Sequence, residues 1–255
     1  GDGSRFGARI RYVEQTTALG IAHAVGRLEQ HIRNPFLLVL GDIFFVPGPL
    51  ESLFALYEEQ DGGAVLATKE EHDEKAIQRN YALVLNPDGM VTRVIEKPRH
   101  VRNRLKGVGL YLFDLTIFDA IRRTPRTAMR DEYEITDAIQ ILIDDGYPVR
   151  PCNAVVDDIN LTTPADLLYC NLLLAKASGG SLIGQNVEIA DGAAISRCVI
   201  GDDAAVRNPI ELTESLVFPG TQVRLATGVK RFILAPELSV DCSQGISQEQ
   251  LGRWA

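Results

Sequence analysis

Hydrophobic and polar positions alternate between helical and extended periods along the first two thirds of the chain. Apolar residues recur every three or four positions over 19–32, which predicts a helix. Five consecutive apolar residues over 36–40 predict a central strand that is covered on both faces. Further strands are expected at 9–15, 64–69, 81–85, 91–96 and 107–113, and further helices at 50–59, 134–145 and 167–175. The Asn-Pro-Asp-Gly turn at 86–89 predicts that the strands at 81–85 and 91–96 form a hairpin. This order predicts an α/β domain with a Rossmann-like, mostly parallel sheet and helices on both faces.

A different period begins after Gly179. Isoleucine and valine recur six residues apart at 183, 189 and 195, at 200 and 206, and at 217, 223 and 229, with steps of five and eleven residues between these groups. Six-residue spacing is typical of a left-handed β-helix, in which each face contributes one inward aliphatic side chain. We therefore predict an α/β domain over 1–177, a β-helix over 181–241 and a C-terminal tail over 242–255. The alternative is a chance run of valine and isoleucine in an ordinary β domain.

Charge and composition limit the function classes. The 255 residues include 34 acidic and 26 basic side chains, so the net charge is −8, and the sequence pI is about 5.1. This balance argues against a general nucleic-acid binder, whose surface is usually basic. No apolar stretch approaches the roughly 20 residues of a membrane helix, and residues 1–30 lack the layout of a signal peptide. The four cysteines form no CxxC pair, which favours a reducing cytoplasm.

Carboxylates follow two of the predicted strands. Gly41 and Asp42 come directly after the strand at 36–40, and Asp157 and Asp158 end a short apolar stretch. Ligands of parallel sheets bind outside the carboxyl ends of the strands, and carboxylate oxygens suit Mg²⁺. These acidic residues could share one Mg²⁺. The alternative is that Asp42 caps the turn that follows it.

Two further motifs have candidate chemistry. Glu96 and Lys97 end a predicted strand, where lysine could meet a phosphate and glutamate could accept hydrogen bonds from sugar hydroxyls. The alternative is an ordinary exposed strand end. Gly107 and Gly109 leave one side of their strand without side chains, which suits either a closely packed ligand or tight internal packing.

The order of the motifs is more specific than any one of them. Gln15, Leu19-Gly20-Ile-Ala22 and Gly41-Asp42 are followed by Glu96-Lys97-Pro98, Gly109-Leu-Tyr111, Glu132-Tyr-Glu-Ile-Thr-Asp137, and Asp158 ahead of Thr163-Pro164. In this order, over about residues 1–175, the chain resembles the sugar-1-phosphate nucleotidylyltransferases. It is most similar to their glucose-1-phosphate thymidylyltransferase branch, and a hexapeptide-repeat tail is frequent in that family.

The resemblance implies a role for each matching residue. Gln15 and Gly20 would contact the nucleotide base, Glu96 the sugar and Lys97 the sugar phosphate. Gly109 would line the sugar pocket. Asp42 and Asp158 would bind Mg²⁺ in a solvent-filled cleft, so that replacing either would change stability little.

The resemblance also implies the reaction. A nucleoside triphosphate, dTTP or UTP, and a sugar 1-phosphate such as glucose 1-phosphate would give a nucleotide-sugar and pyrophosphate. No nucleic-acid polymer and no membrane is expected as a partner, and the sequence leaves open whether the protein forms a homo-oligomer.

The chain departs from the family pattern in three places. The run from Asp158 to Pro164 is two residues longer than the family's, which leaves open whether Asp157 or Asp158 is the metal ligand. Ala82 follows Tyr81 where the family usually has glycine. The family's glycine-rich phosphate loop and first strand would precede Gly1, so this chain by itself is expected to be weakly active or inactive and to expose an unpaired sheet edge. A catalytically silent regulatory or assembly subunit is the alternative.

Overall fold

The computed structural model describes residues 1–101, 103–128 and 130–246. The chain divides into two compact units, the first formed by 1–41 and 45–158 and the second by 42–44 and 159–255. Each unit is described by itself below.

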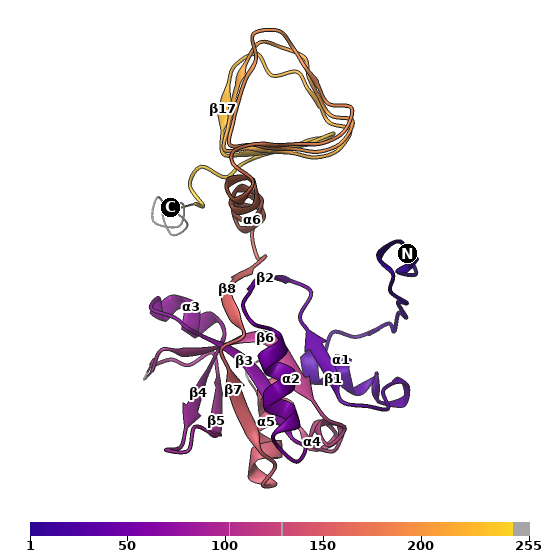
Figure 1. Ribbon diagram of the computed structural model, residues 1–255, viewed down its shortest axis with the longest axis vertical. Coiled ribbons are helices and arrows are strands. Elements are labelled where there is room, and N and C mark those ends of the chain that lie inside the picture. Colours follow the sequence, from indigo (N-terminus) through magenta and orange to yellow (C-terminus); the bar gives the residue numbers. More distant parts are fainter. Residues whose placement is uncertain (102, 129, 247–255) are drawn as a thin grey trace. The chain divides into compact units, whose positions relative to one another are not determined.

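A six-stranded sheet forms the centre of the first unit (Figure 1). Its order is β5-β4-β6-β3-β7, and β1 also pairs with β6. The strands are β1 (Phe36–Val39), β3 (Ala64–Glu70), β4 (Tyr81–Leu85), β5 (Val91–Glu96), β6 (Leu105–Phe113) and β7 (Val149–Cys152). The hairpin predicted at 81–96 is confirmed with its predicted bounds, because Asn86 and Gly89 close the turn between β4 and β5 through a backbone hydrogen bond.

The directions of the strands give the sheet its mixed character. β6 runs antiparallel to β1, β3 and β4, β5 runs antiparallel to β4, and β7 runs parallel to β3. β1, β3, β4 and β7 therefore share one direction. Among the described strands of this sheet only β3 and β7 are parallel neighbours, because the opposed strand β6 lies between the others. The predicted α/β class is confirmed.

Helices cover both faces of this sheet. They are α1 (Ile21–Gly26), α2 (Glu51–Glu58), α3 (Glu74–Arg79), α4 (Ile117–Arg123) and α5 (Ile135–Asp144). On one face α1, α4 and α5 pack against a core that includes Leu66 and Phe113. On the other, Leu53 of α2 packs against Val65 and Val108. Leu66 and Val65 point to opposite faces because successive side chains of a strand alternate.

Three predictions about this unit are wrong. Residues 9–15 form no strand, and Ile10 and Tyr12 are exposed, since this segment has no strand to pair with in the described structure. The predicted helix at 19–32 is confined to α1 and a 3₁₀ turn at Glu29–His31. β1 is not covered on both faces: Leu37 and Val39 are 41% and 50% exposed, and β1 pairs with β6 alone among the described strands.

The second unit begins with a helix. α6 (Pro164–Ala177) starts at a capping box, in which the Thr163 hydroxyl accepts from the N–H of Asp166 and the Asp166 carboxylate accepts from the N–H of Thr163. Leu168 and Leu172 of α6 pack against Leu216 and Ile233 of the β-helix. This helix therefore belongs with the β-helix, whereas the predicted boundary near 177–181 assigns it to the α/β domain.

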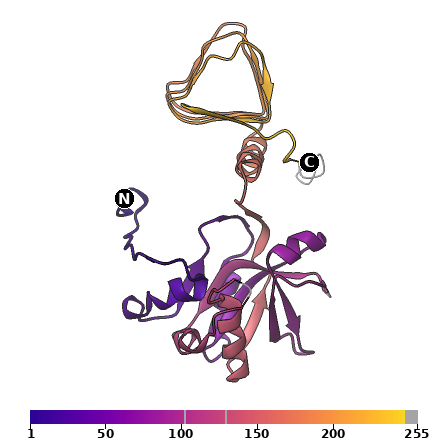
Figure 2. The same cartoon turned by 180° about the vertical axis from the view of Figure 1, so that it is seen from behind.

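Coils of a β-helix make up the rest of the second unit, and Figures 1 and 2 show them stacked as a triangle. Parallel pairing joins Leu182 to Val199, Val199 to Leu216 and Leu216 to Ile233, so each coil has 17 residues. The strands are β9 (Leu182–Ile183), β10 (Glu188–Ile189), β11 (Ala194–Ser196), β12 (Val199–Ile200), β13 (Ala205–Val206), β14 (Glu211–Thr213), β15 (Leu216–Val217), β16 (Gln222–Val223), β17 (Val229–Lys230), β18 (Phe232–Ala235) and β19 (Leu238–Asp241). The predicted β-helix is confirmed, and its handedness stays a prediction.

Two six-residue sides and one five-residue side explain the interrupted spacing. Ile200, Val206 and Leu212 of the second coil are at most 1% exposed, and Leu212 fills the position skipped by the eleven-residue step. Ile183 and Ile189 lie on β9 and β10 but are 46% and 41% exposed, because these strands of the first coil pair on one side only. Of the predicted tail at 242–255, residues 247–255 lie outside the described part.

Corners of the β-helix repeat with the same period. Arg197, Glu214 and Arg231 are 17 residues apart and all have positive φ values, of 50°, 47° and 61°. Their side chains join, since both arginines donate hydrogen bonds to the Glu214 carboxylate.

Candidate active site

The first cluster of expected site residues surrounds the start of α1. The Gln15 side-chain amide donates to the carbonyl oxygen of Gly20 at 3.2 Å, and its Nε2 lies 2.8 Å from Nδ1 of His23. The backbone of Tyr133 brackets this turn, because its N–H donates to Leu19 and its carbonyl accepts from Ala22. The structure therefore brings together Gln15 and Gly20, the two residues expected to contact the base.

Gly20 is required by this turn. Its φ is +96°, and a Cβ at this position would lie 2.5 Å from the carbonyl oxygen of Tyr133. A side chain would meet both backbone strain and a fixed carbonyl group. Glycine thus lets the segment before α1 approach the Tyr133 backbone closely.

Glu96 forms a second cluster with Arg130 and with the start of α5. Oε2 of Glu96 accepts from the Thr136 hydroxyl at 3.3 Å, and Nη1 of Arg130 lies 3.6 Å from Oε1. Arg130 also pairs with Glu134 at 3.3 Å. Burial raises the pKa of Glu96, and the charge of Glu134 adds to this effect, while Lys97 and Arg130 oppose it.

Lys97 has an unusual backbone for a lysine. Its φ is +41°, and its N–H donates to the carbonyl of Asn80 at 2.8 Å. Non-glycine residues seldom adopt positive φ, and such strain is concentrated at functional sites. The Lys97 side chain is exposed, so its ammonium group is available to a ligand.

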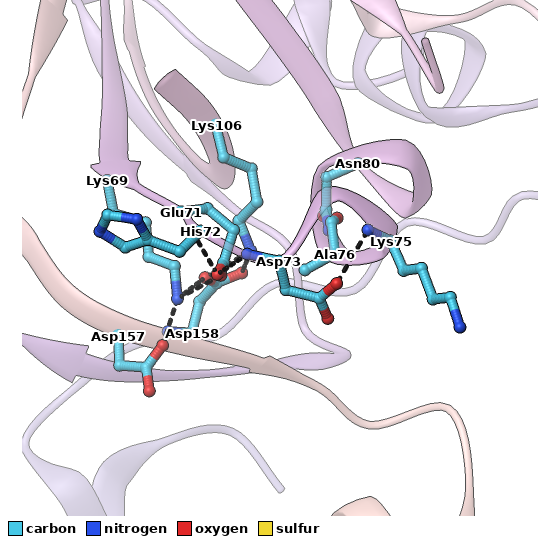
Figure 3. A network of polar contacts seen from close by, with 10 residues as sticks. All are labelled: Lys69, Glu71, His72, Asp73, Lys75, Ala76, Asn80, Lys106, Asp157 and Asp158. Atoms are coloured by element: carbon cyan, nitrogen blue, oxygen red, sulfur yellow. Dashed lines mark hydrogen bonds and ion pairs between the residues drawn. The ribbon is translucent and has the colours of Figure 1, made fainter. Parts of the chain in front are cut away.

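A third cluster contains the acidic pair of β8 (Val155–Asn160), a strand that pairs with β2 (Ile43–Pro47). Figure 3 shows Asp157 and Asp158 facing Lys69, Lys106 and Glu71. Nζ of Lys106 lies 2.7 and 2.8 Å from the two carboxylate oxygens of Asp158. Nζ of Lys69 contacts Asp157 and lies 3.3 Å from Oδ1 of Asp158 and 3.1 Å from Oε2 of Glu71.

These charged groups are buried. The side chains of Asp158, Lys106 and Lys69 are 1%, 3% and 8% exposed, and that of Asp157 is 15% exposed. Burial lowers the pKa of Lys106 despite the neighbouring Asp158 carboxylate. Burial also acts to lower the pKa of Lys69, but the hydrogen bond to Asp157 and the surrounding carboxylates raise this pKa above its ordinary value.

The solvent-filled cleft expected around Asp158 is therefore absent at this carboxylate, which is buried. The strands place it against two lysines that face each other across β3 and β6.

Asp42 and Gly109 have fewer contacts that bear on their expected roles. Asp42 is exposed, lies in the second unit just before β2, and accepts a hydrogen bond from the Leu161 N–H through its backbone carbonyl. Gly109 is buried in β6, and its carbonyl accepts from the N–H of Leu40. Because Asp42 and Asp158 belong to different units, their joint action on one Mg²⁺ stays a prediction.

The space beside Gly107 is used for internal packing and not for a ligand. It pairs with Tyr81 across β6 and β4, and a Cβ on Gly107 would overlap the Tyr81 ring. The bare side of the strand at this position is filled by the protein itself.

Several residues of these clusters were not identified from the sequence. Arg130 could have been found from its spacing to Glu134, since charges four residues apart can pair. The pairing of Lys69 and Lys106 with the acidic pair of β8 gave no local signal, because Asp157 is 88 residues from Lys69 and Asp158 is 52 residues from Lys106 in the sequence.

The described residues contain no group of three or more histidine, cysteine, aspartate or glutamate side chains arranged to hold a metal ion. They also contain no helix that is both long enough and apolar enough to cross a membrane.

Comparison with known proteins identifies relatives of this chain. A 218-residue stretch is 34% identical to Agl11 of Haloferax volcanii, a nucleotidyltransferase of low-salt glycan biosynthesis, and covers 84% of this chain and 55% of that protein. A 231-residue stretch is 32% identical to the glucose-1-phosphate thymidylyltransferase of Streptomyces griseus, covering 88% of this chain and 61% of the relative. The chain thus spans less than two thirds of the length of these relatives.

A third relative and a solved structure agree with these two. AglF of Haloferax volcanii, a UTP–glucose-1-phosphate uridylyltransferase, is 35% identical over 143 residues, which are 56% of this chain and 58% of AglF. A crystal structure from Bacillus anthracis, provisionally named a glucose-1-phosphate thymidylyltransferase and solved with sucrose, superposes with a TM-score of 0.59. At 24% identity, covering 68% of each chain, this likeness concerns the fold.

The family assignment rests on a match over the α/β unit. The model of the nucleotidyl transferase family matches residues 1–156, which include the clusters around Gln15 and Glu96. Together with the relatives, this match confirms the resemblance found in the order of the motifs, and the chain belongs to the nucleotidyl transferase family.

Proposed function

We propose that the protein containing this chain transfers a nucleotidyl group from a nucleoside triphosphate to a sugar 1-phosphate. The observation that carries the proposal is the contact of Glu96 with Thr136 and Arg130, which joins two motifs of the family in one polar cluster next to the exposed Lys97. Family membership and the names of the relatives support the same reaction.

The proposed reaction is an in-line displacement. A phosphate oxygen of the sugar 1-phosphate attacks the α-phosphorus of the triphosphate, and a new P–O bond forms. The bond between the α-phosphorus and the bridging oxygen breaks, and pyrophosphate leaves with the electron pair. Such chemistry depends on positioning and on neutralising charge, so it requires no covalent protein nucleophile.

The residues have separate roles in this proposal. Gln15 and Gly20 hold the base, and the bracketing Tyr133 backbone fixes their turn. Glu96 accepts hydrogen bonds from sugar hydroxyls, and Gly109 lines the sugar pocket. Lys97 pairs with the sugar phosphate, since its exposed ammonium group lies beside Glu96.

The preferred substrates follow from the relatives. Their names include both a thymidylyltransferase and a uridylyltransferase that act on glucose 1-phosphate. We therefore propose dTTP or UTP as the nucleotide and glucose 1-phosphate as the sugar phosphate.

The fit of a Mg²⁺ ion differs between the expected ligands. Asp42 is exposed, and we propose it as a metal ligand. Asp158 does not fit, because Lys106 contacts both of its oxygens and its side chain is buried. We therefore assign no step of the reaction to a metal held by Asp158.

Lys97→Ala tests the proposal. With a preparation of the whole protein, this variant should lower kcat/KM for the sugar phosphate by the equivalent of about 2 to 4 kcal/mol, by analogy with other removed transition-state donors. KM for the triphosphate should change little. Lys176→Ala, at an exposed lysine on α6, is the control. Equal activity of both variants across dTTP, UTP and a panel of sugar phosphates would refute the role of Lys97.

A catalytically silent homologue is the second candidate, and the lysine pairing of Asp158 favours it. Pyrophosphate release separates the two candidates. Binding of triphosphate and sugar phosphate without release by the whole protein would indicate the silent subunit.

A further inference from the structure

We infer that Lys106 takes the place of a divalent cation at Asp158, so that Asp158 is not a metal ligand in this chain and Asp157 is the carboxylate of the pair that remains open to a metal. The inference concerns the binding properties of this cluster and holds whether or not the protein is catalytically active.

The first step is the geometry of Asp158. Nζ of Lys106 lies within 2.8 Å of both carboxylate oxygens, and Nζ of Lys69 lies 3.3 Å from one of them. The two Lys106 distances are ordinary lengths for charged hydrogen bonds, and the longer Lys69 distance is that of an ion pair. Both oxygens of Asp158 are therefore occupied by a cation that belongs to the chain.

The second step is the space that Mg²⁺ requires. Mg²⁺ takes six oxygen ligands in near-octahedral geometry and usually keeps several waters. The Asp158 side chain is 1% exposed, so a hydrated ion has no access to it while Lys106 stays in place. A metal that displaced Lys106 would leave that ammonium group buried without its partner, which is strongly unfavourable.

Two lysines are buried side by side in this cluster. Lys69 and Lys106 are direct partners on antiparallel strands, where like charges repel. Their burial is tolerated because Asp157, Asp158 and Glu71 surround them, as Figure 3 shows. The two lysines and Asp158 thus stabilise one another as an internal ion cluster.

The third step distinguishes Asp157 from Asp158. Oδ1 of Asp157 accepts from Lys69 and from the N–H of Asp158. Its other oxygen, Oδ2, has no hydrogen-bond partner within the described part of the chain, and the side chain is 15% exposed. The cluster also contains one more carboxylate than ammonium groups, which favours a cation at the open oxygen.

Mn²⁺ binding tests the inference without any substrate. Electron paramagnetic resonance of Mn²⁺ would be recorded with the wild-type chain, Asp157→Asn and Lys106→Met. Lys106→Met removes the ammonium group from both oxygens of Asp158 and leaves a flexible apolar side chain. A metal can displace this side chain without leaving a buried charge unpaired, so Asp158 becomes available. We expect this variant to bind Mn²⁺ at least about tenfold more tightly than the wild type, a change of roughly 1.4 kcal/mol.

A double variant identifies the carboxylate responsible. Lys106→Met/Asp158→Asn should lose the gain in Mn²⁺ affinity, whereas Asp157→Asn should weaken any binding shown by the wild type. Circular dichroism of each variant shows whether it is folded. No gain in a folded Lys106→Met variant would overturn the inference.

The wild-type background provides a test that does not depend on Lys106→Met. Wild-type Mn²⁺ binding that Asp158→Asn abolishes and Asp157→Asn preserves would overturn the inference, and the reverse pattern would support it. An absence of wild-type binding would overturn the assignment of Asp157. Because the readout is metal binding, a failure of the proposed transferase activity leaves this result unchanged.

Discussion

Gly107 lies directly against the ring of Tyr81, and the two residues are partners across β6 and β4. Tyr81 is buried, and its ring also stacks on Tyr111 with the centroids 6.0 Å apart. The glycine therefore makes room for an aromatic side chain of the core.

Gly107→Ala should destabilise the protein by about 1 to 3 kcal/mol, because the added methyl overlaps the Tyr81 ring in a packed interior. Urea unfolding measures the change. Gly41→Ala is the control, since a Cβ there meets nothing within 4 Å, and it should change stability by less than about 0.5 kcal/mol. Equal losses in the two variants would contradict the packing explanation.

Asp158→Asn should be far more destabilising than Asp157→Asn. The first change leaves the buried Lys106 facing a neutral group, and breaking a buried pair in this way costs about 3 to 5 kcal/mol. After the second, Lys69 still contacts Glu71 and Asp158, so the loss should be smaller. The free energies of unfolding of both variants decide the matter, and a small effect of Asp158→Asn would restore the solvent-filled cleft predicted from the sequence.

Glu96→Gln should stabilise the protein at neutral pH more than at pH 4. Burial raises the pKa of Glu96, with a further contribution from Glu134, so the folded state binds this proton more tightly than the unfolded state. Stability therefore falls as the pH rises from the ordinary carboxyl pKa through the raised one. The difference in Tm between wild type and variant at the two pH values measures this. Glu58→Gln, at an exposed glutamate of α2, is the control, and an effect of Glu96→Gln on Tm that is the same at both pH values would contradict the explanation.

Glu214→Gln should weaken the β-helix by about 1 to 3 kcal/mol at neutral pH, because it removes the charge shared by Arg231 and Arg197. Burial acts to raise the pKa of Glu214, but the two arginines lower it below the ordinary value. The stabilisation is thus present above the ordinary carboxyl pKa and is lost as the pH falls through the lowered one. Thermal unfolding across this range should show wild type and variant converging in acid.

Glu188→Gln is the control for that prediction. Glu188 pairs with Arg207 at the surface, where an ion pair contributes less than about 1 kcal/mol. If Glu188→Gln destabilised the protein as much as Glu214→Gln, the burial of Glu214 would not explain the loss.

The unpaired edge of β1 predicts that this chain associates with itself, and Val39→Lys should reduce that association. Val39 is half exposed on β1, whose second edge is unpaired in the described structure, and lysine on an edge strand opposes pairing with another chain. Light scattering over a concentration series measures the effect. Leu85→Lys, on the hairpin strand β4, is the control. Equal association of wild type and Val39→Lys would show that this edge is not the surface of contact.

Local patterns predicted the elements that depend on neighbours in the sequence. The turn between Asn86 and Gly89 determined the hairpin, and the aliphatic spacing after Gly179 predicted the β-helix. The prediction of a strand at 9–15 was wrong, because alternating apolar and polar residues do not form a strand without a neighbouring strand to pair with. The spacing of isoleucine and valine also missed Leu212, because this position of the repeat has a leucine.

The candidate site could be predicted only in part. The order of the motifs indicated Gln15, Gly20, Glu96 and Lys97, and the structure joins them in two clusters. The surroundings of Asp158 could not be predicted, since they depend on the register that places Lys69 opposite Lys106. A carboxylate within a strand, such as Asp158 in β8, has the same local sequence whether a metal or a lysine faces it.

The 17-residue coil limits how this part of the protein can change in length. Each coil contacts only its neighbours, and Arg197, Glu214 and Arg231 occupy one corner because they recur with the same period. Deleting one residue from a side would shift every later aliphatic side chain and every later corner out of line. Duplication of a whole coil would keep both in step, so evolution can lengthen or shorten this β-helix in units of 17 residues.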